Sequence, residues 1–162
     1  MQSVIGIQLL VPPHKSPVLK DQITQAIKER FTIIDQDSQV LFLTIDTDAS
    51  SIKELIDPYG SEAVIGSWLQ LDEEWEEGRM FSDYGLTTPT GNRYLDLDLA
   101  AIWTIEAIDI TSEPGLAWLQ ADEFILAQIQ ADGQRLAAFD RQLEQLLEKT
   151  AAAYGCRMQY MT

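Results

Sequence analysis

The stretch "YLDLDLAAIWTIEAIDI", residues 94–110, decides the fold class, because its apolar residues follow a regular alternation. The odd-numbered positions from 95 to 107 are all apolar, whereas even-numbered positions carry Asp96, Asp98 and Glu106. A period of two is typical of a β-strand with one buried face, and the helical period of 3.6 does not fit this stretch. The pattern therefore predicts a strand with Asp96 and Asp98 on its outer face.

The predicted strand is longer than most strands. Thirteen residues in extended conformation would span about 43 Å, well beyond the usual strand length. We therefore expect a bend or bulge at Ala100–Ala101. At 107–110 the apolar residues move to even-numbered positions, Ile108 and Ile110, and Asp109 takes an odd-numbered one. We expect a second bulge or the end of the strand there.

The first 71 residues alternate between strand and helix patterns. β-Branched and apolar residues predict strands over 3–11 and 62–71, and the polar turn at 35–39 predicts a hairpin. Ser16 followed by Pro17 is typical of a helix start, and this helix should end near Arg30.

A second, short helix is expected over 50–57, with Ser50 or Ser51 as its cap, followed by a type I turn at 57–60. The resulting β-α-β-β-α-β order is that of a ferredoxin-like split β-α-β sandwich. That architecture hosts many functions, so it predicts none for this chain.

The C-terminal third reads as helical. Ser112 can cap a helix that ends or kinks at Asp132-Gly133. A second apolar stripe predicts a long C-terminal helix, which Gly155 terminates before a last strand; the stripe comprises Leu136, Phe139, Leu143, Leu146, Leu147 and Tyr154. The expected fold is α+β, in one domain over 1–162, with an antiparallel or mixed sheet and helices packed on one face.

The net charge of −15 is concentrated in the middle of the chain. Residues 35–132 hold 21 acidic residues against three basic ones, a net charge of −18, whereas both flanks are slightly positive. Such a field repels nucleic acid and anionic membranes and attracts cationic partners or ions. Solubility alone is the alternative reason for this acidity.

The N-terminal residues lack the basic start and the cleavage site of a signal peptide. No apolar run approaches the roughly 18 residues of a membrane span. We therefore expect a cytoplasmic protein that does not contact membranes.

Residue types that many enzyme motifs require are scarce. His14 is the only histidine and Cys156 the only cysteine, so an intramolecular disulfide or a Cys/His metal cluster is excluded. Cys156 follows a predicted helix end, where a packed thiol is expected rather than a nucleophile. No P-loop, dinucleotide-binding or nucleophile-elbow motif occurs. We expect no cofactor, and a non-catalytic protein is favoured over an enzyme.

The acidic segment 72–94 is a candidate partner-binding loop. Its carboxylates are interleaved with Trp75, Met80, Phe81 and Tyr84, residue types that protein interfaces favour. The alternative is a loop that folds back on its own core. The segment does not match a calcium-binding loop, because Glu77 stands where the glycine is required.

Two Asp-x-Asp pairs form the sharpest metal hypothesis. Asp46 and Asp48 lie at the end of one predicted strand, and they could join Asp96 and Asp98 around a divalent cation. The alternative for both pairs is a solvated strand face.

The leading hypothesis for the function of the chain is a non-catalytic binding or regulatory module whose acidic surface engages a basic protein partner or forms a homodimer. The alternative function is a divalent-metal-dependent enzyme that uses these four aspartates.

Overall fold

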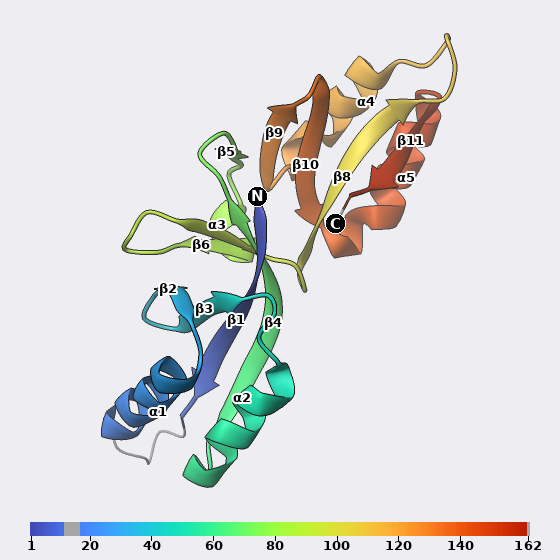
Figure 1. Cartoon of the computed structure of the whole chain (residues 1–162). Coiled ribbons are helices and arrows are strands. Elements are labelled where there is room, and N and C mark those ends of the chain that lie inside the picture. Colours follow the sequence, from blue (N-terminus) through green and yellow to red (C-terminus); the bar gives the residue numbers. More distant parts are fainter. Residues whose placement is uncertain (12–16, 162) are drawn as a thin grey trace. The chain divides into compact units, whose positions relative to one another are not determined.

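The computed structural model describes residues 1–11 and 17–161 and has an α+β fold (Figure 1). Its strands form two antiparallel sheets, one of them curled into a half-barrel, and the described residues include five α-helices. Contacts divide the chain into two compact units. Unit 1 comprises Met1–Gln70 with Thr87–Tyr94, and unit 2 comprises Leu71–Leu86 with Leu95–Thr162. The expectation of a single domain over 1–162 stays a prediction, because this division concerns contacts and not folding.

The N-terminal elements follow the β-α-β-β-α-β order expected from the sequence. They are β1 (Gln2–Leu10), α1 (Pro17–Arg30), β2 (Ile33–Gln36), β3 (Val40–Thr44), α2 (Ala49–Ile56) and β4 (Glu62–Leu71). The helix α1 ends at Arg30, as predicted; its expected cap Ser16 and the histidine His14 lie outside the described residues. The turn expected at 57–60 forms as the 3-10 helix η1 (Asp57–Tyr59), where the Gly60 N–H donates to the Asp57 carbonyl at 2.9 Å.

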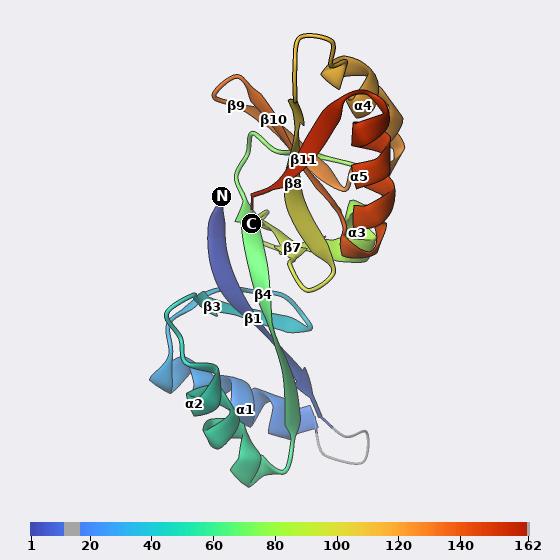
Figure 2. The ribbon, with the colours of Figure 1, turned by 90° about the vertical axis from the view of Figure 1, so that its right-hand side faces the viewer.

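These strands belong to a six-stranded sheet with the order β2-β3-β1-β4-β7-β6, which β6 (Gly85–Thr87) and β7 (Arg93–Asp96) complete. β1 pairs antiparallel with both β3 and β4. The helices α1 and α2 lie against one face of the sheet (Figure 2). Alternate apolar residues of β1 and β3 pack there against the helices, as the strand period requires; the buried set is Ile7, Leu9, Ile23, Ile27, Leu41, Leu43, Ile52 and Ile56.

Aromatic residues gather on the opposite face of this sheet. Phe42 stacks on Tyr94 with 3.7 Å between ring centroids, and it meets Trp68 edge-on at 5.5 Å. The indole of Trp68 lies over Gly6, where an added Cβ would sit 2.3 Å from Nε1. A glycine is therefore required at position 6 for the indole to lie against β1.

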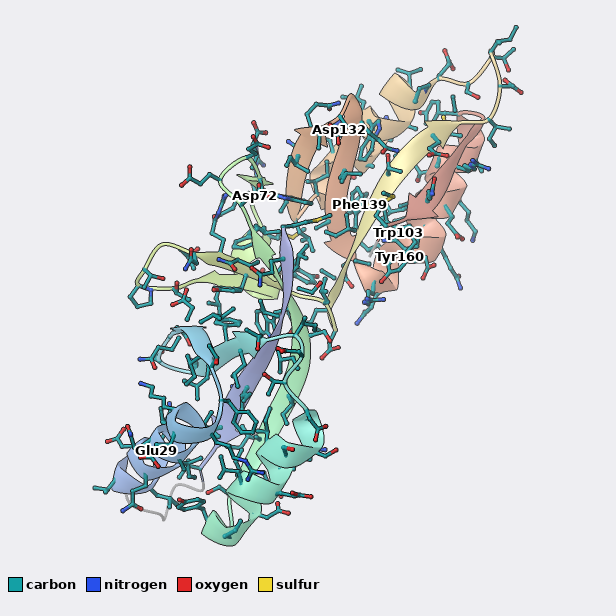
Figure 3. The ribbon with its side chains drawn as sticks, viewed as in Figure 1. Glu29, Asp72, Trp103, Asp132, Phe139 and Tyr160 are labelled. Carbon is teal, nitrogen blue, oxygen red and sulfur yellow. The ribbon has the colours of Figure 1, made fainter. Side chains whose placement is uncertain are left out.

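Unit 2 is built on the five-stranded sheet with the order β11-β8-β10-β9-β5. Its elements are β5 (Glu76–Glu77), α3 (Phe81–Tyr84), β8 (Ala100–Ala107), α4 (Pro114–Ala121), η2 (Asp122–Phe124), β9 (Ala127–Ala131), β10 (Gln134–Asp140), η3 (Arg141–Leu143), α5 (Glu144–Ala153) and β11 (Cys156–Tyr160). Figure 3 shows Trp103 and Tyr160 close together on neighbouring strands, with their ring centroids 5.1 Å apart. The core includes Trp103, Trp118, Phe139 and Leu147, so it joins the sheet to α4 and α5.

The prediction of a long C-terminal helix is wrong. Residues 127–140 form the hairpin of β9 and β10, and only the ten residues of α5 are α-helical after it. Asp132 and Gly133 take positive φ angles of 51° and 77°, which suit the tight turn of a hairpin. Leu136 to Phe139 are all buried, as in a strand covered on both faces. Such a continuous apolar run has no period of two, so it fits a buried strand and a helix equally well.

The opening stretch is also divided differently from the prediction. β7 ends at Asp96 and β8 begins at Ala100, so a turn at 97–99 replaces the bulge expected at Ala100–Ala101. The two strands belong to different sheets, so the chain passes from one sheet to the other in this turn. Residues 100–105 are buried on both faces and Leu99 is exposed, so the predicted alternation does not extend through β8. The strand ends at Ala107, as expected.

Candidate functional site

The acidic segment 72–84 is ordered by two buried aromatic side chains. Trp75 is 2% exposed and Phe81 is 3% exposed. β5 pairs antiparallel with β9, with Glu76 opposite Gln128. These contacts hold the backbone of the segment at the edge of the sheet of unit 2.

Gly78 fixes the path of the backbone directly after β5. The Gly78 N–H donates to the Leu126 carbonyl at 2.8 Å. An added Cβ at Gly78 would lie 1.9 Å from the carbonyl oxygen of Ile125, so a side chain is excluded there. The chain therefore passes close to Ile125 and then presents Arg79 and Met80 at the surface.

The four residues predicted to bind a partner have different positions. Trp75 and Phe81 are buried, so the alternative of a loop folded onto its own core describes them better. Met80 is 37% exposed. Tyr84 is half-buried and donates to Asp140 Oδ2 at 2.7 Å; this hydrogen bond, together with burial, raises the pKa of the phenol. Met80 is thus the most exposed of the four, and a partner-binding role for these residues stays a prediction.

A groove with a volume of about 520 Å³ lies in unit 2 between this segment and the end of α4. The apolar part of its lining consists of Met80, Leu119 and Ile125. The lining also carries three carboxylates and one guanidinium. The residues around the groove are Glu77, Gly78, Arg79, Met80, Leu119, Gln120, Asp122, Glu123, Ile125 and Gln128.

A hydrogen-bonded network fixes the polar side of the groove. Gln128 Nε2 donates to Glu76 Oε2 at 3.1 Å, and Arg135 Nε donates to Gln128 Oε1 at 2.9 Å. Arg135 also pairs with Asp122, with 3.1 Å between Nη2 and Oδ1, and its guanidinium lies over the ring of Trp118 at 4.7 Å. Arg135 thus offsets the charge of Asp122, and the rest of the lining carries Glu77 and Glu123 together with Arg79.

The four aspartates of the metal hypothesis have local structural roles or remain solvated. Asp48 caps α2 by accepting from the N–H groups of Ser50 and Ser51, so the serines predicted as caps are donors to the actual cap. Asp46 is exposed.

Asp96 Oδ1 accepts from the Asp98 N–H at 2.8 Å in the turn after β7. Burial and the nearby charge of Asp98 raise the pKa of Asp96, although backbone N–H groups counteract them. The predicted outer face is thus half-buried at Asp96 and exposed at Asp98. Within the described ranges 1–11 and 17–161, no group of three or more His, Cys, Asp or Glu side chains is arranged to hold a metal ion. The metal site therefore stays a prediction without an observation in its favour.

Asp35 is a buried carboxylate that no local sequence pattern marks. It is 6% exposed, and four side chains of the described segment 87–94 donate to its Oδ2 atom; they are Thr88 at 2.7 Å, Thr90 at 2.9 Å, Asn92 at 2.8 Å and Tyr94 at 3.2 Å. Its Oδ1 atom accepts from the Gln36 N–H at 2.8 Å. Burial tends to raise the pKa of Asp35, but the hydrogen bonds outweigh it and lower that pKa below its ordinary value.

Neither a family model nor a curated protein nor a solved structure matches the chain. Among the described residues, no helix is both long and apolar enough to cross a bilayer. The sole cysteine, Cys156, is buried, and its thiol donates to the Tyr154 carbonyl at 3.4 Å.

Proposed function

We propose that the chain is a non-catalytic binding module that engages a basic segment of a partner protein in the acidic groove of unit 2. The observation that carries this proposal is the burial of Trp75 and Phe81. These two anchors hold the 72–84 segment so that Glu77 faces the same groove as Glu123. A binding surface that is ordered before the partner arrives loses less conformational entropy on association.

Charge identifies the class of partner. The groove has more carboxylates than cations, and it belongs to a region of the sequence with a net charge of −18, from 21 acidic and three basic residues. A field of this sign accelerates association with Lys- and Arg-rich surfaces and repels acidic ones. Such steering weakens with ionic strength, because the Debye length is about 10 Å at 0.1 M salt.

Apolar side chains give the groove affinity beyond charge. Leu119 is 66% exposed and Met80 is 37% exposed, and both line the groove. Desolvated apolar contacts at the centre with polar groups at the rim are the usual composition of protein interfaces. The partner segment should therefore carry apolar residues among its lysines or arginines.

Two further features belong to this proposal. The strand order β2-β3-β1-β4 supports a ferredoxin-like architecture for the N-terminal elements, which by itself assigns no function. A cytoplasmic location is also part of the proposal and rests on the sequence alone, because a chain with a single cysteine is not built around intramolecular disulfides.

The proposal is tested by calorimetric titration of the full chain with a synthetic peptide of lysines and leucines. We expect the double variant Glu77→Gln/Glu123→Gln to bind roughly fivefold more weakly, since two exposed ion pairs contribute about 0.5 kcal/mol each. Asp132→Asn/Glu148→Gln, which removes two exposed charges of unit 2 outside the groove lining, should bind like the parent chain. Equal losses of affinity in both variants would show that only net charge matters and would contradict binding in the groove.

Gel filtration distinguishes peptide binding from self-association of the chain. A dimer that excludes the peptide would contradict a basic partner and favour self-association.

A further inference from the structure

The helix α4 (Pro114–Ala121) has two different faces. Its inner face buries Ala117, Trp118 and Ala121 in the core of unit 2. Its outer face exposes Leu116, at 44%, and Leu119, at 66%. Residues three apart in a helix lie on the same side, about one turn from each other. The two leucines therefore form an exposed apolar strip along α4.

This strip continues the lining of the acidic groove. Leu119 belongs both to the strip and to the groove, where Met80 also lies. The eight residues of α4, PGLAWLQA, carry no charged side chain, but acidic residues stand at both of its ends. Glu113 precedes the helix, and Asp122 and Glu123 follow it in η2. The strip is thus apolar along its length and acidic where it begins and ends.

We infer that the basic segment bound by unit 2 is an amphipathic α-helix that lies along α4. This inference rests on the proposed function and specifies the conformation of the partner. Apolar residues three or four positions apart in the partner helix pack against Leu116, Leu119 and Met80. Lysines or arginines beside them reach Glu113 at one end of the strip and Glu123 at the other.

The geometry favours a helix over an added strand. Strand addition requires a row of backbone groups along an exposed sheet edge. The edge strand beside the groove, β5, has only two residues, Glu76 and Glu77, and is too short to template a partner strand; the other edge strand of this sheet, β11, contributes no residue to the groove. Two leucines one turn apart match instead the spacing of side chains on a second helix packed at the usual 8–10 Å between axes.

The test uses two peptides of identical lysine and leucine content. In one peptide the leucines recur with the helical period of 3.6, and in the other they alternate with lysine at the strand period of two. Titration into the full chain should give at least tenfold tighter binding for the helical isomer, with helical circular dichroism appearing in the complex. Equal affinities that depend on Glu77 and Glu123 would overturn the helical partner and leave the proposed function in place. Absence of binding by either peptide would overturn both.

Variants of the strip locate the bound helix. Leu116→Ser/Leu119→Ser should weaken binding of the helical isomer at least tenfold, because both leucines lose their contact with the peptide. Ile108→Ser/Ile110→Ser is the matched control, because both isoleucines are exposed in the stretch before α4 and lie outside the groove lining. Both leucines are already exposed, so circular dichroism should show an unchanged fold in the leucine double variant. Equal loss in the control and the leucine double variant would overturn the placement along α4.

Discussion

Replacement of Asp35 by asparagine should loosen unit 1, because this buried carboxylate holds the segment 87–94. Asp35 Oδ2 accepts from Thr88, Thr90, Asn92 and Tyr94, and Oδ1 accepts from a backbone N–H. An amide at this position offers only one acceptor oxygen. Whichever way it turns, its NH₂ group faces donors, and at least one hydrogen bond is lost.

The size of the effect follows from the strengths of these bonds. Hydrogen bonds to a charged group contribute about 1.5–3 kcal/mol, and neutral ones contribute about 0.5–1.5 kcal/mol. Four weakened bonds to Oδ2 would therefore lose about 4 kcal/mol in sum. The asparagine also avoids the burial of a charge, which offsets part of this loss. We expect a net decrease of about 2 kcal/mol in the free energy of unfolding of unit 1 at pH 7.

Amide hydrogen exchange in β3 is the appropriate assay, because it reports on unit 1 even where the two units unfold separately. Asp37→Asn is the matched control in the same hairpin. Asp37 Oδ1 accepts from the backbone N–H groups of Gln39 and Val40, both at 2.7 Å, and an asparagine oxygen can keep both bonds. Equal protection in Asp35→Asn and the parent chain would refute the structural role of Asp35.

The pH dependence gives a second check on the same residue. The hydrogen bonds lower the pKa of folded Asp35 below its ordinary value of 3.8. Its stabilisation is therefore fully present above that value and is lost as the pH falls through the lowered pKa. The stability difference between the parent chain and Asp35→Asn should shrink below about pH 4. A difference that grows on acidification would contradict the ionised state of Asp35.

Four further substitutions have defined outcomes. Gly6→Ala would place a methyl group 2.3 Å from Trp68 Nε1 and should destabilise unit 1 by about 1–3 kcal/mol in urea unfolding. Trp75→Ala should cost about 3–5 kcal/mol in the same assay, whereas Met80→Ala should change stability by less than about 1 kcal/mol; similar losses in both would contradict Trp75 as an anchor. Gly78→Ala should remove the cross-strand contacts of β5 with β9 in NMR spectra, since its Cβ would meet a carbonyl at 1.9 Å.

The sequence predicted the N-terminal half well, because its local signals agree with one another. The run at 62–71 coincides with β4, and the turn residues at 35–39 mark the hairpin of β2 and β3. The α+β class follows from these elements alone. The prediction for the C-terminal half is wrong at Asp132-Gly133, because Asp-Gly is compatible with a helix end as well as with the hairpin turn that the structure shows. In β10, alanines and large apolar residues are buried on both faces, and this removes the alternation that would have revealed a strand.

The candidate site was predicted in part. Composition located the acidic segment 72–84, but local sequence does not decide which aromatic side chains become buried. Trp75 and Met80 therefore received the same interpretation, although one is buried and the other exposed. The role of Asp35 could not be predicted, because its side-chain donors lie 53 to 59 residues away along the chain. Such long-range contacts depend on the topology of the sheet and not on spacing.

The central claim, that the acidic groove of unit 2 binds a basic segment, is tested most directly by chemical-shift mapping. The isotopically labelled full chain is titrated with the helical lysine–leucine peptide, and every backbone amide is followed. We predict the largest shifts at residues 76–80 and 116–123, with saturation at one peptide per chain. Small shifts scattered over the acidic surface, or large shifts confined to unit 1, would contradict the claim.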